Sequence, residues 1–292
     1  MKDFSFWMEY EGASEGSGRS EKVWLINPDT NQTGLFKYKK DETTTDHASE
    51  CIAYELATLI EIPCARFELG TYHSREGSMS YNIVDDSKKV LIEGIYGINL
   101  KYNNFDAEKL EDAETGERYS LEMIKEVLEP MGLFDDFFPM LLLDFLIGNT
   151  DRHQSNWALI MENKKFRVSP LYDNSSSLCA YVKESKIEQY LGKDLLLWNS
   201  LVDTKSKSLI RITNRDKRQP THLEVLKFLK NYYYIQTIDT VRKIESVVTE
   251  ESVCAIVDRY GEVLSTKRKN LIKKFLLSKI QFMIEVYKNK EA

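Results

Sequence analysis

The sequence predicts an α+β fold with two lobes: a small β-rich lobe over residues 1–85 and a larger all-helical lobe over residues 86–292. Two observations lead to this prediction. Short segments of β-type composition gather around a single amphipathic helix in the first 85 residues, whereas helical periodicity fills most of the remainder. A chain of 292 residues is long enough for two lobes with a buried core. Because ligands often bind between such parts of a fold, we expect a cleft between the lobes.

The N-terminal lobe is expected to form a small sheet with one helix. A polar loop that contains glycine and serine, EGASEGSGRSEK, joins the first two strands into a hairpin with a long tip. After the third strand, apolar residues recur at helical spacing in HASECIAYELATLIEI, and Pro63 ends this helix. The expected strands are Phe4–Tyr10, Val23–Ile26, Gly34–Lys39, Ala65–His73 and Ser78–Val84.

Helical periodicity dominates the C-terminal lobe. The last helix contains the basic stretch KRKNLIKK, which we interpret as a solvated face opposite an apolar face that docks inward. The expected helices are Ser120–Leu128, Phe134–Ile147, Lys186–Trp198, His222–Tyr234, Ile238–Val248, Ser252–Arg259 and Ser265–Lys288.

Composition excludes several classes of protein. The 40 basic and 46 acidic residues give a formal charge of −6, which argues against direct binding of nucleic acid. The four cysteines are scattered without CxxC spacing, as expected of reduced thiols rather than a disulfide framework or a zinc site. The N-terminus lacks an apolar core of signal-peptide length, and no apolar run is long enough to span a bilayer. We therefore expect a cytoplasmic protein that does not insert into a membrane.

The segment LLLDFLIGNTDRHQSNWALI carries the most chemical information. An apolar helix runs into a polar loop and then a short strand, and Asp151 and Asn156 lie five residues apart in the loop. This is the spacing of a kinase catalytic loop, in which the aspartate orients the attacking hydroxyl and the asparagine holds Mg²⁺. Seventeen residues further on, Asp173 ends the apolar run FRVSPLYD, where a second oxygen ligand for Mg²⁺ is expected.

Residues upstream supply the remaining parts of a phosphate site. Lys37 lies in an apolar strand, where an unpaired ammonium is costly to bury, and Glu50 of the following helix is placed to pair with it. The glycines of the first loop allow backbone N–H groups to approach phosphate. Each feature alone has an ordinary structural explanation, such as a helix cap, an Asx turn or a lysine at a strand edge. Their occurrence together, in the order that kinases use, favours a kinase.

The strings GNTDRHQSNWALI, SPLYDNSSSL and ASECIAYELATLIEIP resemble the HipA-like serine/threonine kinases. The resemblance implies ATP and Mg²⁺ as cofactors, Asp151 as the catalytic base, and Asn156 and Asp173 as the metal ligands. It also implies that Lys37, supported by Glu50, binds ATP. The residues expected at the adenine-binding hinge are Tyr81, Asn82 and Ile83.

The same resemblance extends to the loops. Gly16, Ser17 and Gly18 would lie at the phosphates, and His153 would support the catalytic loop, with direct proton transfer as its alternative role. Members of this family autophosphorylate a serine of the phosphate loop, for which Ser14, Ser17 and Ser20 are the candidates here.

HipA toxins are longer and begin with an extra N-terminal subdomain, so this chain looks like the short, CtkA-type members. A toxin or effector role is implied, with a protein substrate that the sequence does not identify. An antitoxin, or a separate protein that supplies the N-terminal subdomain, is the expected partner.

Two other functions stay open at this point. A phosphoinositide-type lipid kinase shares the DRHxxN loop, but it needs basic residues after the metal-binding aspartate. Between Asp173 and Leu191, Lys183 and Lys186 are balanced by two glutamates, which favours a protein hydroxyl as acceptor. A non-catalytic nucleotide-binding scaffold usually lacks the base or a metal ligand, whereas this chain retains both.

Overall fold

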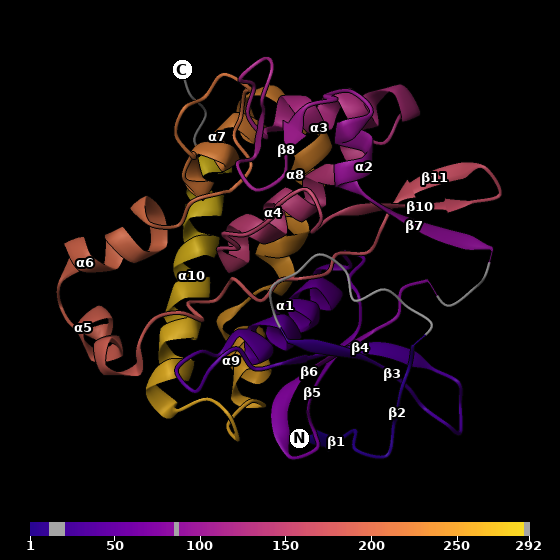
Figure 1. Ribbon diagram of the computed structural model, residues 1–292. Coiled ribbons are helices and arrows are strands. Elements are labelled where there is room, and N and C mark those ends of the chain that lie inside the picture. The colour runs from indigo at the N-terminus through magenta and orange to yellow at the C-terminus, as the bar shows by residue number, and fades with distance from the viewer. Residues whose placement is uncertain (12–20, 85–87, 289–292) are drawn as a thin grey trace.

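The computed structural model describes residues 1–11, 21–84 and 88–288 of the chain. It confirms a mixed α+β fold, in which a curled sheet and a group of helices pack together (Figure 1). The main sheet has six strands in the order β1-β5-β6-β4-β3-β2. These strands are β1 (Lys2–Asp3), β2 (Met8–Glu9), β3 (Lys22–Ile26), β4 (Thr33–Tyr38), β5 (Phe67–Tyr72) and β6 (Arg75–Tyr81).

A second sheet lies on the other side of helix α1 from the main one in the view of Figure 1. Its order is β11-β10-β7, and both pairings are antiparallel. Its strands are β7 (Lys89–Glu93), β10 (Ala158–Glu162) and β11 (Lys165–Val168), and a two-stranded ribbon is formed by β8 (Phe105–Asp106) and β9 (Glu111–Asp112).

The helices account for most of the chain after residue 120. A short helical turn precedes α4 at Asp135–Phe137, and a π-helical turn follows α6 at Ser200–Thr204. The helices are α1 (Asp46–Ile60), α2 (Gly94–Asn99), α3 (Leu121–Leu128), α4 (Phe138–Ile147), α5 (Ile187–Leu191), α6 (Leu195–Asn199), α7 (His222–Tyr232), α8 (Tyr234–Val247), α9 (Glu250–Asp258) and α10 (Thr266–Lys288).

Three expectations from the sequence were wrong. The C-terminal lobe is not all-helical, because β7, β10 and β11 form a sheet within residues 86–292. Residues Phe4–Tyr10 do not form one strand: Trp7 N–H donates to the Phe4 carbonyl at 2.8 Å, so a turn directs both aromatic side chains into the core. The expected helix Lys186–Trp198 is interrupted at Gly192, after which the Asp194 side chain caps α6.

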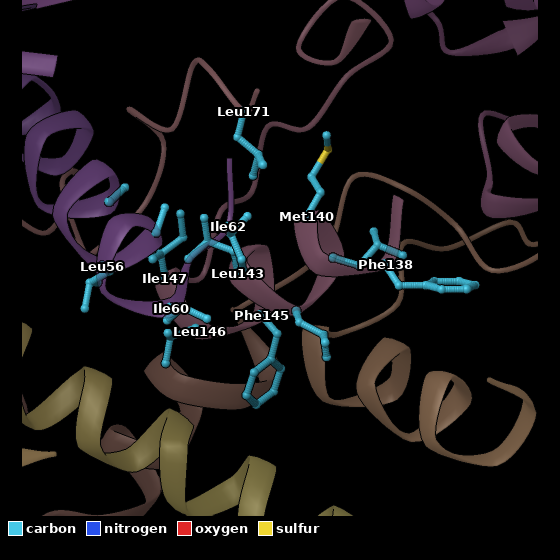
Figure 2. Packing of buried hydrophobic residues seen from close by; sticks show 14 of the residues in the cluster. Leu56, Ile60, Ile62, Phe138, Met140, Leu143, Phe145, Leu146, Ile147 and Leu171 are labelled. Carbon is cyan, nitrogen blue, oxygen red and sulfur yellow. The ribbon is translucent and has the colours of Figure 1, made fainter. Parts of the chain in front are cut away.

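Helix α4 forms the centre of the large hydrophobic core. Every residue of α4 except Pro139 is buried, as expected of a helix that is apolar on all sides. Figure 2 shows Leu143 and Ile147 of α4 close to Leu56 and Ile60 of α1. The same core includes residues of α7, α8, α9 and α10. Because α1 packs into this core as well as on the main sheet, the proposed boundary after residue 85 stays a prediction.

The described part of the chain has no helix with both the length and the apolar composition needed to cross a membrane. Its four cysteines are all free thiols.

Candidate active site

The loop that follows α4 begins at a glycine. Gly148 has a φ of 65°, a left-handed conformation that ends the helix. A Cβ atom at this position would lie 2.7 Å from Cζ of Phe275, so the close approach of α10 also requires glycine. The chain therefore leaves the buried helix abruptly and carries residues 149–156 toward the surface.

Hydrogen bonds within the loop fix Asp151 and Asn156 relative to each other. The Asp151 carbonyl accepts from Nδ2 of Asn156 at 2.8 Å and from the backbone N–H of His153 at 2.9 Å. The hydrogen bond from Nδ2 fixes the orientation of the Asn156 amide. Its side-chain oxygen is left to bind a cation or to accept a hydrogen bond. His153 Nδ1 accepts the Ser155 N–H at 3.2 Å, and the supporting role of this histidine stays a prediction.

Arg152 joins this loop to two other segments. It is 1% exposed, and all five of its N–H groups are donated. Two go to the carboxylate of Asp144 in α4, at 2.7 and 2.9 Å. The others go to the carbonyls of Asn156 and Tyr172, at 2.8 and 2.7 Å, and to Oδ1 of Asn174 at 2.7 Å. The buried guanidinium thus holds the loop of residues 149–156, the segment around residue 173 and α4 in one arrangement.

Lys37 brings the main sheet to the same place. It lies in β4, between Lys22 of β3 and Ser78 of β6. Its Nζ is 3.3 Å from Oε1 of Glu50 in α1 and 3.0 Å from Oδ1 of Asp173. The pairing of Lys37 with Glu50 was expected from the sequence, whereas the contact with Asp173 was not.

The second oxygen of Glu50 connects α1 to the segment after Asp173. Glu50 is 1% exposed, and its Oε2 accepts the backbone N–H of Asn174 at 2.7 Å. The same asparagine accepts from Arg152, so polar contacts run without a break from Lys37 to Asp144. Such a fully paired buried network fixes the positions of its members.

One lysine between two carboxylates leaves this cluster short of positive charge. Burial raises the pKa of Glu50 to about 7, despite the opposing effect of Lys37. Burial would also raise the pKa of Asp173, but Lys37 outweighs this effect and lowers it to about 2. Burial alone lowers the pKa of Lys37, and the two carboxylates more than reverse this, so its pKa is raised. A further cation beside Asp173 would relieve the repulsion between the carboxylates.

Asp173 lies at a strained turn that is tied to the N-terminal half of the chain. Its φ is 53°, and Leu178 and Cys179 nearby also have positive φ values, which are uncommon for such residues. Two residues before Asp173, the backbone N–H of Leu171 donates to the Pro63 carbonyl at 2.9 Å. The Leu171 carbonyl accepts from the Ala65 N–H at 2.7 Å. Long-range contacts therefore determine where the Asp173 carboxylate lies.

Asp151 differs from Asp173 in its surroundings. The residue is exposed, yet partial desolvation of its carboxyl raises its pKa, as does the carboxylate of Asp173, while His153 lowers it. A carboxylate with a raised pKa is a better proton acceptor than an ordinary aspartate.

Some of these residues, but not Asp151, Glu50 or Arg152, line a cavity of about 210 Å³. Asn156 and Asp173 lie on its wall with Lys37 and His153, and the predicted hinge residues Tyr81, Asn82 and Ile83 line it as well. Its remaining lining residues are Lys22, Trp24, Leu35, Ala65, Ser80, Leu91, Glu93, Ser155 and Tyr172. The mixture of aromatic, aliphatic and charged side chains suits a ligand with a flat ring at one end and anionic groups at the other.

The sequence did not reveal every residue of this cavity. Leu91 and Glu93 come from β7, a five-residue strand that was not predicted, because its apolar run Val90–Ile92 is only three residues long. Asn174 and Asp144 were missed because their roles depend on contacts between distant segments. Gly16, Ser17 and Gly18 lie outside the described residues, as do Ser14 and Ser20.

The oxygens of Asn156 and Asp173 fit a divalent cation. Both are hard ligands of the kind Mg²⁺ prefers, and they face one cavity whose acidic cluster lacks positive charge. Within the described residues there is no group of three or more histidine, cysteine, aspartate or glutamate side chains that could hold a metal by themselves. A bound ligand would therefore have to supply further oxygens.

A second buried polar chain supports the loop from behind. His222 Nε2 donates to the Asn149 carbonyl at 2.8 Å, because a carbonyl can only accept. The Ser206 hydroxyl then donates to Nδ1 of His222 at 3.0 Å and accepts from Nζ of Lys279 at 2.8 Å. Lys279 is fully buried, and its Nζ also lies 4.7 Å from the centre of the Phe145 ring.

Replacing Lys279 by methionine should stabilise the protein in a pH-dependent way. Burial lowers the pKa of Lys279 from 10.5 to about 7 in the folded state, so the unfolded chain binds more protons between these values. The free energy of unfolding of the wild type therefore rises with pH from about 7 to 10.5. We expect Lys279→Met to gain about 1–3 kcal/mol at pH 6 and progressively less toward pH 10. Urea denaturation at pH 6 and pH 9.5 measures this.

The exposed Lys227 of α7 offers a matched control, because Lys227→Met removes a solvated ammonium. A gain for Lys279→Met that does not change with pH would show that its amine is not desolvated in the folded state.

The fold and the arrangement of Lys37, Glu50, Asp151, Asn156 and Asp173 define a candidate phosphotransfer site. The chain belongs to the family of the HipA-like C-terminal domain, whose model matches residues 14–250.

Solved structures show the same fold. The Helicobacter pylori proinflammatory kinase CtkA is 18% identical, with a TM-score of 0.82 over 98% of this chain and 96% of that one. A chain of the HipA, HipB and operator DNA complex from the Shewanella oneidensis MR-1 toxin–antitoxin system is 11% identical. Its TM-score is 0.56, over 97% of this chain and 69% of that one. Among curated proteins, none matches the sequence.

Proposed function

We propose that this protein is an ATP- and Mg²⁺-dependent kinase that transfers the γ-phosphate to a serine or threonine of a protein. The observation that carries the proposal is the meeting of Lys37, Asn156 and Asp173 at one cavity, with Asp151 beside it. Membership of the HipA-like family and the likeness in fold to a protein described as a kinase support it.

Each residue has a role in this proposal. Lys37, positioned by Glu50, binds phosphate oxygens of ATP. Asn156 and Asp173 hold Mg²⁺, which neutralises charge that develops on the phosphates during transfer. Asp151 accepts the proton of the attacking hydroxyl, for which its raised pKa suits it. Arg152 keeps Asp151, Asn156 and Asp173 at fixed positions.

The wider role is also part of the proposal. We expect autophosphorylation at Ser14, Ser17 or Ser20, action as a toxin or effector in the cytoplasm, and partnership with an antitoxin or with a separate N-terminal subdomain.

The test is transfer of radiolabelled phosphate from Mg·ATP to the protein itself and to a generic protein acceptor, followed by phosphoamino-acid analysis. Asp151→Asn should lower the rate by about 100-fold or more, since a general base typically contributes that much. ATP binding should not change. Asp136→Asn, at an exposed aspartate before α4, is the matched control and should retain full activity.

A phosphoinositide-type lipid kinase is the second candidate, because the described side chains at the cavity also fit that chemistry. Label that appears in phosphatidylinositol rather than in protein would favour it. ATP binding without transfer to any acceptor would favour a nucleotide-binding scaffold.

A further inference from the structure

A second cavity, of about 440 Å³, is lined by residues from the start of the proposed catalytic loop. Gly148 and Thr150 line it, whereas Asn156 at the far end of the same loop lines the first cavity. The segment after Asp173 is divided in the same way, since Ser176 and the residues that follow it face the second cavity. The remaining lining residues are Ser177, Cys179, Ala180, Tyr181, Val182, Lys183, Lys186, Tyr190, Leu201, Lys205, Ser206 and Phe275.

Along the chain, Asp151 lies between Thr150, which lines the second cavity, and Asn156, which lines the first. It directly follows Thr150, and its residue is exposed rather than covered by either wall. A hydroxyl held in the second cavity beside Thr150 would therefore lie near the residue that is proposed to accept its proton. This is the placement that transfer between two bound molecules requires.

Three lysines give the second cavity a strong positive charge. Lys183, Lys186 and Lys205 are exposed and line it, and none forms an ion pair with any residue that the structure describes. Lys40 adds a fourth ammonium nearby: its Nζ lies 5.2 Å from the centre of the Tyr181 ring. These cations are available to a ligand.

The acidic residue nearest to them in sequence is engaged elsewhere. Oε2 of Glu184 lies 3.2 Å from the guanidinium of Arg268, and its Oε1 accepts from the Ser265 hydroxyl. The sequence had suggested that Glu184 balances the neighbouring lysines, but it contacts α10 instead. The lysine-lined cavity is therefore more basic than the local sequence indicates.

The wall of this cavity is held in place from two sides. Arg268, which is 1% exposed, donates to the carbonyls of Cys179 at 2.8 Å and of Val182. From α1, Ser49 Oγ donates to the Ser177 carbonyl at 3.2 Å. Lys183 and Lys186 thus directly follow a segment that these hydrogen bonds hold in place, which lowers the cost of ordering it when a ligand binds.

We propose that this cavity binds the phosphate acceptor and selects a protein segment that carries acidic or phosphorylated side chains beside the acceptor serine or threonine. The inference rests on the proposed kinase function and adds the substrate class. Unpaired ammonium groups attract carboxylates and phosphates and set partner preference. The net charge of −6 disfavours docking on an anionic membrane, whereas a short acidic segment is attracted by the local lysines.

The test uses fluorescent peptides with one serine flanked by glutamate, by glutamine or by lysine. Binding to the full chain with Mg²⁺ and a non-hydrolysable ATP analogue is measured by anisotropy, and transfer from ATP is measured in parallel. We expect the glutamate peptide to bind about 10-fold more tightly than the glutamine peptide, as several weak ion pairs together would give.

Three charge reversals, Lys183→Glu, Lys186→Glu and Lys205→Glu, should remove this preference and raise KM for the glutamate peptide about 10-fold, while ATP binding stays unchanged. The corresponding triple glutamine variant should weaken the preference without reversing it. The matched control reverses Lys101, Lys164 and Lys217, which are exposed and line none of these cavities, and which change the net charge equally. The control should retain the wild-type preference.

Transfer to all peptides at equal efficiency would overturn the inference and leave the kinase proposal standing. Transfer to phosphatidylinositol phosphate vesicles but not to peptides would overturn it in favour of a lipid acceptor. Selective binding of the glutamate peptide without any transfer, lost in the lysine variant, would overturn the kinase proposal and leave an acidic-peptide site.

Discussion

Asp173→Asn is expected to lower phosphate transfer by about 1,000-fold or more, because one charged group at a transferring phosphate contributes on that order. The asparagine keeps the shape of the side chain but removes its negative charge. That charge would hold Mg²⁺, and it pairs with Nζ of Lys37 at 3.0 Å. The measurement is the initial rate of transfer across a range of Mg²⁺ concentrations. Retention of more than a tenth of the activity with an unchanged Mg²⁺ requirement would contradict the assignment.

The same substitution separates loss of function from loss of stability. Asp173 raises the pKa of Glu50, but Lys37 lowers the pKa of Asp173 itself despite burial, so the Asp173 charge stabilises the folded state on balance. We therefore expect Asp173→Asn without ligand to melt modestly below the wild type, still in one cooperative transition. The increase in melting temperature that Mg·ATP produces should be lost, whereas Asp136→Asn should keep it. A variant that is inactive because it is unfolded would fail the first of these criteria.

Periodicity predicted the regular parts of the fold. Helices α1, α3, α4 and α7 to α10 lie within a few residues of their expected positions, because each buries one face or all of its surface in the core. Strands β3 to β6 also match. The strand β7 and the helix α2 were not predicted, since β7 is short and gains its stability from pairing with β10, more than 60 residues away in the sequence.

The candidate site was predicted as a set of residues but not as an arrangement. The five-residue spacing predicted that Asp151 and Asn156 lie in one loop. The order of a strand followed by a helix predicted that Lys37 pairs with Glu50. The contact between Lys37 and Asp173 joins residues 136 positions apart, which no local pattern encodes.

The structure also reveals which buried group holds the loops together. The partners of Arg152 on α4 and after residue 171 could not be derived from spacing. The basic character of the second cavity was hidden for a similar reason. Its lysines come from separate segments, and the intervening Glu184 is paired with α10.

Arg152→Met should lower the free energy of unfolding by about 3–5 kcal/mol, as expected when one member of a buried ion pair is removed. Asp144, which is 3% exposed, would keep its charge without a partner. The carbonyls of Asn156 and Tyr172 and Oδ1 of Asn174 would also lose donors. Urea denaturation of the purified variant measures the loss.

Two further variants distinguish an unpaired charge from a loss of packing. Arg242→Met removes an exposed pair with Asp239 on α8, whose side chains are 67% and 90% exposed, and should cost less than about 0.5 kcal/mol. Combining Arg152→Met with Asp144→Leu removes both charges of the buried pair and should recover at least half of the lost stability. Both Arg152→Met and the double variant should be inactive in phosphate transfer, because the loop of residues 149–156 and the segment around Asp173 no longer share a common donor. Full recovery of phosphate transfer in the double variant would show that Arg152 does not position these segments.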